Sequence, residues 1–150
     1  IELNEAFAAQ SLAVIHDFTI GYLEGGFESW KKSGRETDQI KSVTAEELAA
    51  INERQPVNLL DVRKKSEFQS EHVIDAINAP LDNINESMAQ IDRNKTYYVH
   101  CAGGYRSMIF VSILRARGFD NLVDVKAGFK ALKESGRFAV SDYVCPSTLL

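Results

Sequence analysis

Residues 96–117 read TYYVHCAGGYRSMIFVSILRAR, and this stretch decides the fold. Its first part, Thr96–His100, is rich in β-branched and aromatic residues, which predicts a buried strand. Further on, apolar residues are spaced as on one broad face of a helix: Met108, Val111, Ile113 and Leu114. Gly118 would end this helix. A tight loop, residues 101–106 with the sequence CAGGYR, therefore connects a strand to a helix.

The loop places Cys101 where the strand ends and the helix is about to begin. The first amides of a helix have no intrahelical acceptors, and the helix dipole adds positive charge there. Gly103 and Gly104 allow successive N–H groups to turn inward, and Arg106 lies in the same turn. We therefore expect the Cys101 thiol to ionise readily and to act as a nucleophile. The alternative is a small buried cysteine at a strand end, which is common in α/β cores.

A strand, the pattern C-x-x-G-x-R and a helix resemble the active-site loop of the rhodanese (sulfurtransferase) family. The resemblance extends upstream to Leu59–Arg63 (LLDVR) and downstream to Val125–Phe129 (VKAGF), and it covers about residues 42–137. Any one of these motifs would be a weak signal, whereas the combination is specific. The chain departs from the family pattern where glycine or tryptophan is common, at turn and packing positions: Glu71, Asp75, Ala127 and Phe129.

The resemblance implies that the Cys101 thiolate takes the outer sulfur from thiosulfate or a low-molecular-weight persulfide. A thiol acceptor or cyanide would then remove the sulfur from the Cys101 persulfide. The loop residues that would bind the substrate are Ala102, Gly103, Gly104, Tyr105, Arg106 and Ser107. The Tyr105 and Ser107 hydroxyls would act at the rim of the loop, although plain packing and helix capping explain them equally well. Asp61 and Arg63 are expected to brace the site without a catalytic role.

Two other functions compete with sulfur transfer. Cysteine phosphatases and arsenate reductases also use a strand, a cysteine loop, an arginine and a helix, but they need C-x-x-x-x-x-R to surround a tetrahedral oxyanion. Only four residues separate Cys101 from Arg106 in this chain, which favours a sulfur over a phosphate. A non-catalytic interaction module is the third possibility, and the intact cysteine and glycine-rich loop argue against it.

The remaining histidines and the second cysteine give weaker signals. His16, His72 and His100 share no metal-ligand spacing, so we expect no metal, and nothing else indicates a cofactor. Strand alternation should turn His100 away from the loop, as a hydrogen-bonded core histidine. Cys145 lies in an apolar tail and is expected to be packed there, with a second sulfur carrier as the alternative.

Composition limits the class of protein. A chain of 150 residues accommodates one α/β domain with a sizeable core, and its net charge of −4 argues against nucleic acid as a partner. No apolar run reaches membrane-spanning length, so no membrane association is expected. The two cysteines are far apart in sequence, which indicates no disulfide framework and favours a reducing, cytoplasmic location.

The order of predicted elements indicates a parallel sheet. Residues 57–60, 76–78, 96–100 and 122–125 read as strands. Helices are predicted at 45–52, 65–70 and 129–135, with a further helical segment around 81–91; Thr44 and Glu47 would form a capping box. Alternating strands and helices predict an α/β fold, a rhodanese-like parallel sheet with helices on both faces.

The first part of the chain repeats the last part. Residues 19–35 align with residues 121–137 at six identical positions of seventeen, which favours a repeat over chance similarity. We therefore expect residues 1–40 to be the C-terminal tail of a preceding rhodanese-like repeat plus a linker, with a helix at 5–15, a strand at 19–23 and a helix at 27–33. Residues 41–150 would be the rhodanese domain with its C-terminal tail.

The predicted tail implies further partners. A strand at residues 19–23 would need a partner from this chain or another, so a homo-oligomer through residues 1–34 is possible. A tandem rhodanese arrangement of this kind resembles the C-terminal part of metallo-β-lactamase–rhodanese fusion proteins. This resemblance implies an upstream metallo-β-lactamase-like domain in the full-length protein.

Overall fold

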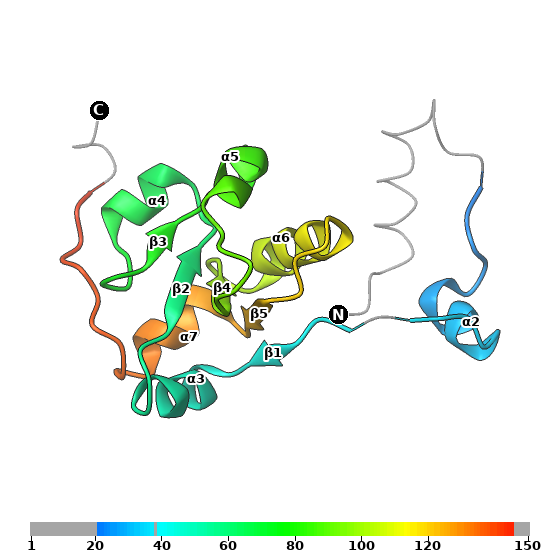
Figure 1. Cartoon of the computed structure of the whole chain (residues 1–150), viewed down its shortest axis with the longest axis horizontal. Helices are drawn as coiled ribbons and strands as arrows, with labels where there is room; N and C mark the ends of the chain where they lie inside the picture. Colours follow the sequence, from blue (N-terminus) through cyan, green and yellow to red (C-terminus); the bar gives the residue numbers. More distant parts are fainter. Residues whose placement is uncertain (1–20, 38, 146–150) are drawn as a thin grey trace. The chain divides into compact units, whose positions relative to one another are not determined.

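A computed structural model describes residues 21–37 and 39–145. The chain divides into two compact units, Ile1–Gln39 and Ile40–Leu150. In the second unit, five strands form one sheet in the order β1-β5-β4-β2-β3, and every pair of neighbouring strands is parallel (Figure 1). This sheet with its helices confirms the α/β fold class.

The strands lie within one or two residues of the predicted ranges, and β1 is an additional short edge strand. Their bounds are Ser42–Val43 (β1), Asn58–Asp61 (β2), Ile77–Asn78 (β3), Tyr97–His100 (β4) and Leu122–Val125 (β5). The central strands β2 and β4 are in register, so that Asp61 lies beside His100 at their carboxyl ends. Ligands of open parallel sheets bind beyond these carboxyl ends.

Helices connect the successive strands of this unit, and a last helix follows β5. Their bounds are Ala45–Asn52 (α3), Lys65–Ser70 (α4), Leu81–Asn83 (the 3-10 helix η1), Ile84–Ala89 (α5), Tyr105–Ala116 (α6) and Gly128–Glu134 (α7). The capping box predicted for α3 is present: the Glu47 amide donates to Thr44 Oγ1 at 3.2 Å, and the Thr44 amide donates to Glu47 Oε2 at 2.8 Å. Both ends of this motif satisfy amides that would otherwise lack an acceptor.

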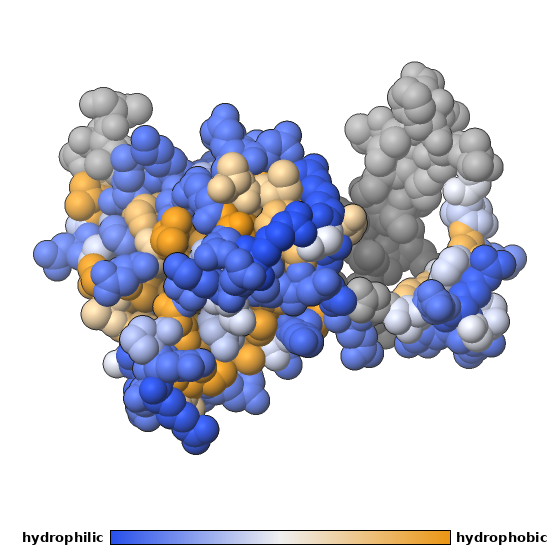
Figure 2. Space-filling view, viewed as in Figure 1, coloured by the Kyte–Doolittle hydropathy of each residue, from blue (hydrophilic) through white to orange (hydrophobic). Residues whose placement is uncertain are grey.

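The core consists of two apolar clusters on opposite faces of the sheet. One cluster joins Leu60 and Val99 to Phe110 and Leu114 of α6. The other joins Leu59 and Val125 to Leu48 of α3 and Leu132 of α7. Helices therefore cover both faces, as predicted. On the face of the molecule seen in Figure 2, hydrophilic and apolar residues are interleaved over this unit.

The buried face of α6 agrees with the predicted one at Val111 and Leu114 and differs from it at the other positions. Met108 is 40% exposed and Ile113 is half-buried, whereas Phe110 and Val111 are completely buried. The residues that pack inward follow the spacing i, i+3, i+4 and i+7: Ser107, Phe110, Val111 and Leu114. A serine at the first of these positions hid the pattern, because it is polar and yet buried.

In the first unit, α2 spans Gly26–Lys32. Residues 21–23 form no strand, so the strand predicted at 19–23 is wrong over its described part, and the helix predicted at 5–15 lies outside the described residues. The turn before α2 uses two consecutive left-handed residues, Gly25 (φ 75°) and Gly26 (φ 54°). The turn before α7 does the same at Ala127 and Gly128, both with φ 58°, which are the positions aligned with them in the repeat.

No helix of the described residues is both long and apolar enough to cross a membrane.

Candidate active site

The loop after β4 surrounds the sulfur of Cys101 with hydrogen-bond donors. Cys101 is only 1% exposed. The Gly104 amide donates to Cys101 Sγ at 3.1 Å, and the Ser107 hydroxyl lies 3.7 Å from the same sulfur. Gly104 adopts φ 106°, which favours glycine and turns its amide into the loop just before α6 begins. The sulfur therefore lies at the N-terminus of a twelve-residue helix.

These donors lower the pKa of the Cys101 thiol. Burial on its own would raise this pKa, because it disfavours the thiolate. The amide and hydroxyl of Ser107 and the amides of Gly104 and Gly103 act in the opposite direction and together outweigh burial. The site thus stabilises an anionic sulfur that is hidden from bulk solvent.

The first turn of α7 supports the loop by donating to its backbone carbonyl groups. The Phe129 amide donates to the Cys101 carbonyl at 2.6 Å, and the Lys130 amide donates to the Ala102 carbonyl at 3.3 Å. Gly128 makes this approach possible, since a Cβ atom there would lie 2.3 Å from the Cys101 oxygen. Two helix N-termini therefore meet at the nucleophile, one facing its sulfur and the other its carbonyl.

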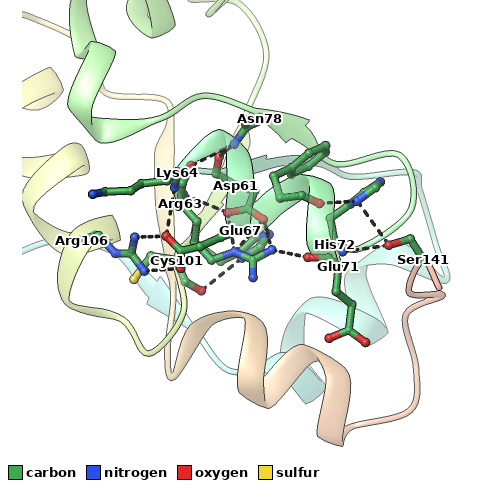
Figure 3. A network of polar contacts seen from close by, with 12 residues as sticks. Asp61, Arg63, Lys64, Glu67, Glu71, His72, Asn78, Cys101, Arg106 and Ser141 are labelled. Atoms are coloured by element: carbon green, nitrogen blue, oxygen red, sulfur yellow. Dashed lines mark hydrogen bonds and ion pairs between the residues drawn. The ribbon is translucent and has the colours of Figure 1, made fainter. Parts of the chain in front are cut away.

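Arg106 does not point freely at the loop centre but forms a bidentate ion pair with Glu67 of α4. Its Nη1 and Nη2 lie 2.6 Å and 2.9 Å from the two Glu67 oxygens (Figure 3). The Arg106 hydrogen bond is the main reason that the pKa of Glu67 is lowered, and Glu67 in turn raises the pKa of Arg106. Glu67 also accepts from the Lys64 amide at 3.2 Å, so the pair connects the loop to the start of α4.

Asp61 and Arg63 form a buried ion pair at the carboxyl end of β2. Arg63 Nε donates to both Asp61 carboxylate oxygens at 2.9 Å, and Arg63 Nη2 also donates to the Glu71 carbonyl at 2.8 Å (Figure 3). The guanidinium packs over the Phe129 ring, 4.1 Å from its centroid. Since Phe129 also binds the Cys101 carbonyl, this pair connects β2 to the support of the loop.

His100 is completely buried between these groups. Its Nδ1 lies 3.4 Å from the Cys101 carbonyl, and its Nε2 lies 4.0 Å from Asp61 Oδ2 without a hydrogen-bond partner. Burial is the main cause of its lowered pKa. The ring stacks on Phe129, on the side of the sheet away from the Cys101 sulfur, where strand alternation places it.

The other predicted residues divide between the surface and the interior. Ala102, Gly103 and Tyr105 are exposed at the loop, with Tyr105 71% exposed. Ser107 is completely buried beneath the sulfur rather than at the rim, because it occupies the inward face of α6. Cys145 is exposed, whereas we expected it to be packed in the tail. Within residues 21–37 and 39–145, His, Cys, Asp and Glu form no cluster that could bind a metal ion.

Sequence reasoning missed the ionic partner of the loop, its glycine support and a buried acid. Nothing in the sequence spacing of Glu67 indicates a contact with Arg106. Gly128 could have been singled out as the glycine before the aromatic residue, since such a glycine often permits close backbone approach. Asp124 stands in a strand of apolar residues, where a carboxylate is unusual.

Comparison with known proteins places residues 44–135 in the Rhodanese-like domain model. The chain is 28% identical over 109 residues to an uncharacterized protein from Synechocystis sp., covering 73% of this chain and 61% of that relative, so it spans less than two thirds of it. It is 30% identical over 92 residues to the thiosulfate sulfurtransferase GlpE of Pseudomonas savastanoi pv. phaseolicola, covering 61% of this chain and 86% of the relative.

A solved structure shows the same fold. The crystal structure of a rhodanese-related protein from Thermoplasma volcanium matches with a TM-score of 0.59 at 33% identity, covering 67% of this chain and 97% of that one. The range matched by the family model includes the strand, cysteine loop and helix described above and the turn before α7. By its sequence and its fold, this chain belongs to the rhodanese-like domain family.

Proposed function

We propose that the protein is a sulfurtransferase that carries a sulfane sulfur on Cys101. The observation that carries this proposal is the buried Cys101 sulfur, which accepts from the Gly104 amide at 3.1 Å and faces the Ser107 hydroxyl. A cradle of this kind stabilises a single anionic sulfur, as an oxyanion hole stabilises oxygen. Thiosulfate sulfurtransferase activity of the relative from Pseudomonas savastanoi supports the same reaction class.

In the first half of the reaction, the Cys101 thiolate attacks the outer sulfur of a donor such as thiosulfate or a low-molecular-weight persulfide. The new S–S bond forms as the donor's S–S bond breaks, and the bonding electrons leave with sulfite or with the donor thiolate. The product is a Cys101 persulfide anion. The amides of Gly103, Gly104 and Ser107, which lower the pKa of the thiol, would stabilise that terminal sulfur in the same way.

In the second half, cyanide or an acceptor thiolate attacks the outer sulfur of the persulfide. Thiocyanate or a new persulfide departs, and the Cys101 thiolate is regenerated without an external redox agent. Arg106 carries a positive charge in the loop that holds Cys101, but its ion pair with Glu67 offsets much of that charge. We therefore assign Arg106 mainly to holding the loop, with a smaller share in attracting anionic donors.

The loop length favours sulfur transfer over the phosphatase alternative. Four residues separate Cys101 from Arg106. A phosphoryl group presents three equatorial oxygens that each need donors, whereas a persulfide presents one sulfur. The guanidinium that would bind those oxygens is engaged with both oxygens of Glu67.

The test is the intact mass of the protein after incubation with thiosulfate. Wild type should gain one sulfur, and cyanide should remove it as thiocyanate. Cys101→Ser should abolish both the mass gain and thiosulfate:cyanide activity. Cys145→Ser is the matched control, because Cys145 is the other cysteine of the sequence, and this variant should retain most of both. Efficient phosphatase activity of wild type, without a cyanide-labile sulfur on Cys101, would show that the proposal is wrong.

The context of the domain is also part of the proposal. We propose that residues 1–40 are the tail of a preceding rhodanese-like repeat, supported by the shared pair of left-handed residues before α2 and α7. Resemblance to metallo-β-lactamase–rhodanese fusion proteins supports an upstream metallo-β-lactamase-like domain. Separately, the wide separation of the two cysteines in sequence supports a cytoplasmic location. The coding sequence upstream of residue 1 tests the first two statements.

A further inference from the structure

The charge of Arg106 is neutralised within the site by Glu67. Nη1 and Nη2 of the guanidinium donate to separate Glu67 oxygens at 2.6 Å and 2.9 Å, and about one third of each side chain is exposed (Figure 3). The Glu67 hydrogen bond is the main cause of the raised pKa of Arg106, and the Cys101 charge also contributes, so this guanidinium lies within electrostatic range of the nucleophile. An anionic donor that approaches Cys101 therefore meets an ion pair rather than a free cation.

The second guanidinium group of the site is not free either. Arg63 is only 5% exposed, and its Nε and Nη2 donate to the Asp61 carboxylate. A guanidinium is the group best suited to bind the three oxygens at the sulfite end of thiosulfate. The lysines at the start of α4 and in the turn into α7 are exposed, so that solvent and salt screen their charges: Lys64, Lys65, Lys126 and Lys130.

The rim of the loop offers apolar contacts instead. Cys101 is only 1% exposed, so the outer sulfur of a donor has to enter the loop while the rest of the donor stays at the rim. Tyr105 and Met108 belong to the first turn of α6, where they are 71% and 40% exposed, and their i, i+3 spacing places them on one side of the helix. Ala102 and Gly103 are exposed as well. An organic substituent on the donor would gain contact area here.

We propose that the preferred donor is an organic sulfane-sulfur compound with at most one negative charge, and that Glu67 sets this specificity by disfavouring the thiosulfate dianion. The inference rests on the proposed function and names the donor class for the same site. The electrostatic energy of a donor near Glu67 is proportional to the charge of the donor. Removal of the Glu67 charge that favours a monoanion by a given factor should therefore favour a dianion by the square of that factor.

The transfer step is the same for every donor of this class. The Cys101 thiolate attacks the outer sulfur, and the new S–S bond forms as the donor's own bond to that sulfur breaks. The bonding electrons leave with sulfite from thiosulfate, with a sulfinate from a thiosulfonate, or with a thiolate from an organic persulfide. The charge and the substituent of the leaving group can thus be varied without altering the sulfur that is transferred.

Three donors separate charge from apolar contact: thiosulfate, methanethiosulfonate and benzenethiosulfonate, of which the last two are monoanions. The measurement is kcat/KM of the full chain with cyanide as acceptor, divided by the rate of the uncatalysed reaction of the same donor with cyanide. This ratio removes differences in intrinsic reactivity. It should increase in the order given, by about threefold for the lost charge and about threefold again for the aromatic ring.

Three variants identify the group that acts on charge. Glu67→Gln should raise kcat/KM about threefold for both monoanions and about ninefold for thiosulfate. Glu67→Asp retains the charge, so its donor ratios should stay within about twofold of wild type, which separates charge from the bracing of Arg106. Glu53→Gln is the matched control and should alter none of the ratios, because Glu53 forms an exposed ion pair with Arg137 outside the loop.

Two results would overturn the inference. Equal fold-changes for the three donors in Glu67→Gln would show that Glu67 only braces the loop. A higher normalised value for thiosulfate than for both monoanions in wild type would do the same, and this measurement needs no variant to fold. If none of the donors leaves a cyanide-labile sulfur on Cys101, the proposed function itself is wrong. Loading of Cys101 by all three donors without the expected order refutes the donor class alone.

Discussion

A methyl group added at Gly128 should displace the loop that carries the nucleophile. Gly128 has φ 58°, and a Cβ there would lie 2.3 Å from the Cys101 oxygen and 2.9 Å from the carbonyl carbon and oxygen of Ala102. Cβ atoms essentially never approach other atoms closer than 3.0 Å, so the backbone of the loop has to move. Gly136 is the matched control, because it has φ 62° and no atom within 4 Å of the Cβ position.

The difference between the two variants isolates the steric effect. Both substitutions place an alanine in the left-handed region, which costs about 1–2 kcal/mol. Only Gly128→Ala adds the cost of forcing atoms into a packed region, about 1–3 kcal/mol. We therefore expect Gly128→Ala to be less stable than Gly136→Ala by about 2 kcal/mol, a difference of about 1 M in the urea midpoint.

Two assays check this prediction: urea unfolding and the pH midpoint of Cys101 alkylation. Gly128→Ala should also raise the alkylation midpoint, since moving the Cys101 carbonyl away from the Phe129 amide disturbs the 3.1 Å contact between Gly104 N and Cys101 Sγ. Gly136→Ala should leave that midpoint unchanged. Equal losses of stability in the two variants, with equal reactivity of Cys101, would refute the account of the loop support.

Three further predictions concern charge and backbone strain. The pKa of Glu67 is lowered by Arg106, so the stability from this pair is fully present above pH 4.5, the ordinary pKa, and is lost as pH falls from there through the lower pKa of the folded state; Glu67→Gln should thus lower the urea midpoint more at pH 7 than at strongly acidic pH, and an equal loss at both would contradict the pairing. Burial lowers the pKa of His100, so the unfolded state binds an extra proton below pH 6.5; wild type should lose stability between pH 8 and pH 5.5, and His100→Gln should lose less. Ala127 adopts φ 58°, so Ala127→Gly should raise the urea midpoint by relieving about 1 kcal/mol of strain, and a lowered midpoint would argue against that strain.

The sequence predicts those structural features that depend on residues close together in the chain. The run Thr96–His100 and the glycine pair of the loop predict the strand, the turn and the position of the cysteine between strand and helix, because each depends on near neighbours in sequence. The capping box of Thr44 and Glu47 was predictable to the residue for the same reason. Local pattern also gave the order of strands and helices, from which a parallel sheet follows.

The contacts that shape the site are long-range and could not be derived from that pattern. Arg106 forms an ion pair with Glu67, which is 39 residues away in sequence. The Phe129 amide that donates to the Cys101 carbonyl comes only after α6 and β5. The inward position of Ser107 was missed because a polar residue on a buried helix face resembles a surface position. Only the three-dimensional structure reveals that its hydroxyl is directed to the Cys101 sulfur and the Gly104 carbonyl.

The turn before α7 shows how proximity to the nucleophile limits the choice of side chain. Ala127 and Gly128 have the same φ of 58°, so their backbone cost of carrying a Cβ is the same. Their surroundings differ: Ala127 is exposed, whereas a Cβ on Gly128 would enter the space of the Cys101 carbonyl. Since backbone conformation is held constant between the two neighbours, the sharper constraint at Gly128 follows from its contact with the loop. The departure from glycine at Ala127 therefore leaves the geometry around Cys101 intact, at a cost of about 1 kcal/mol in strain.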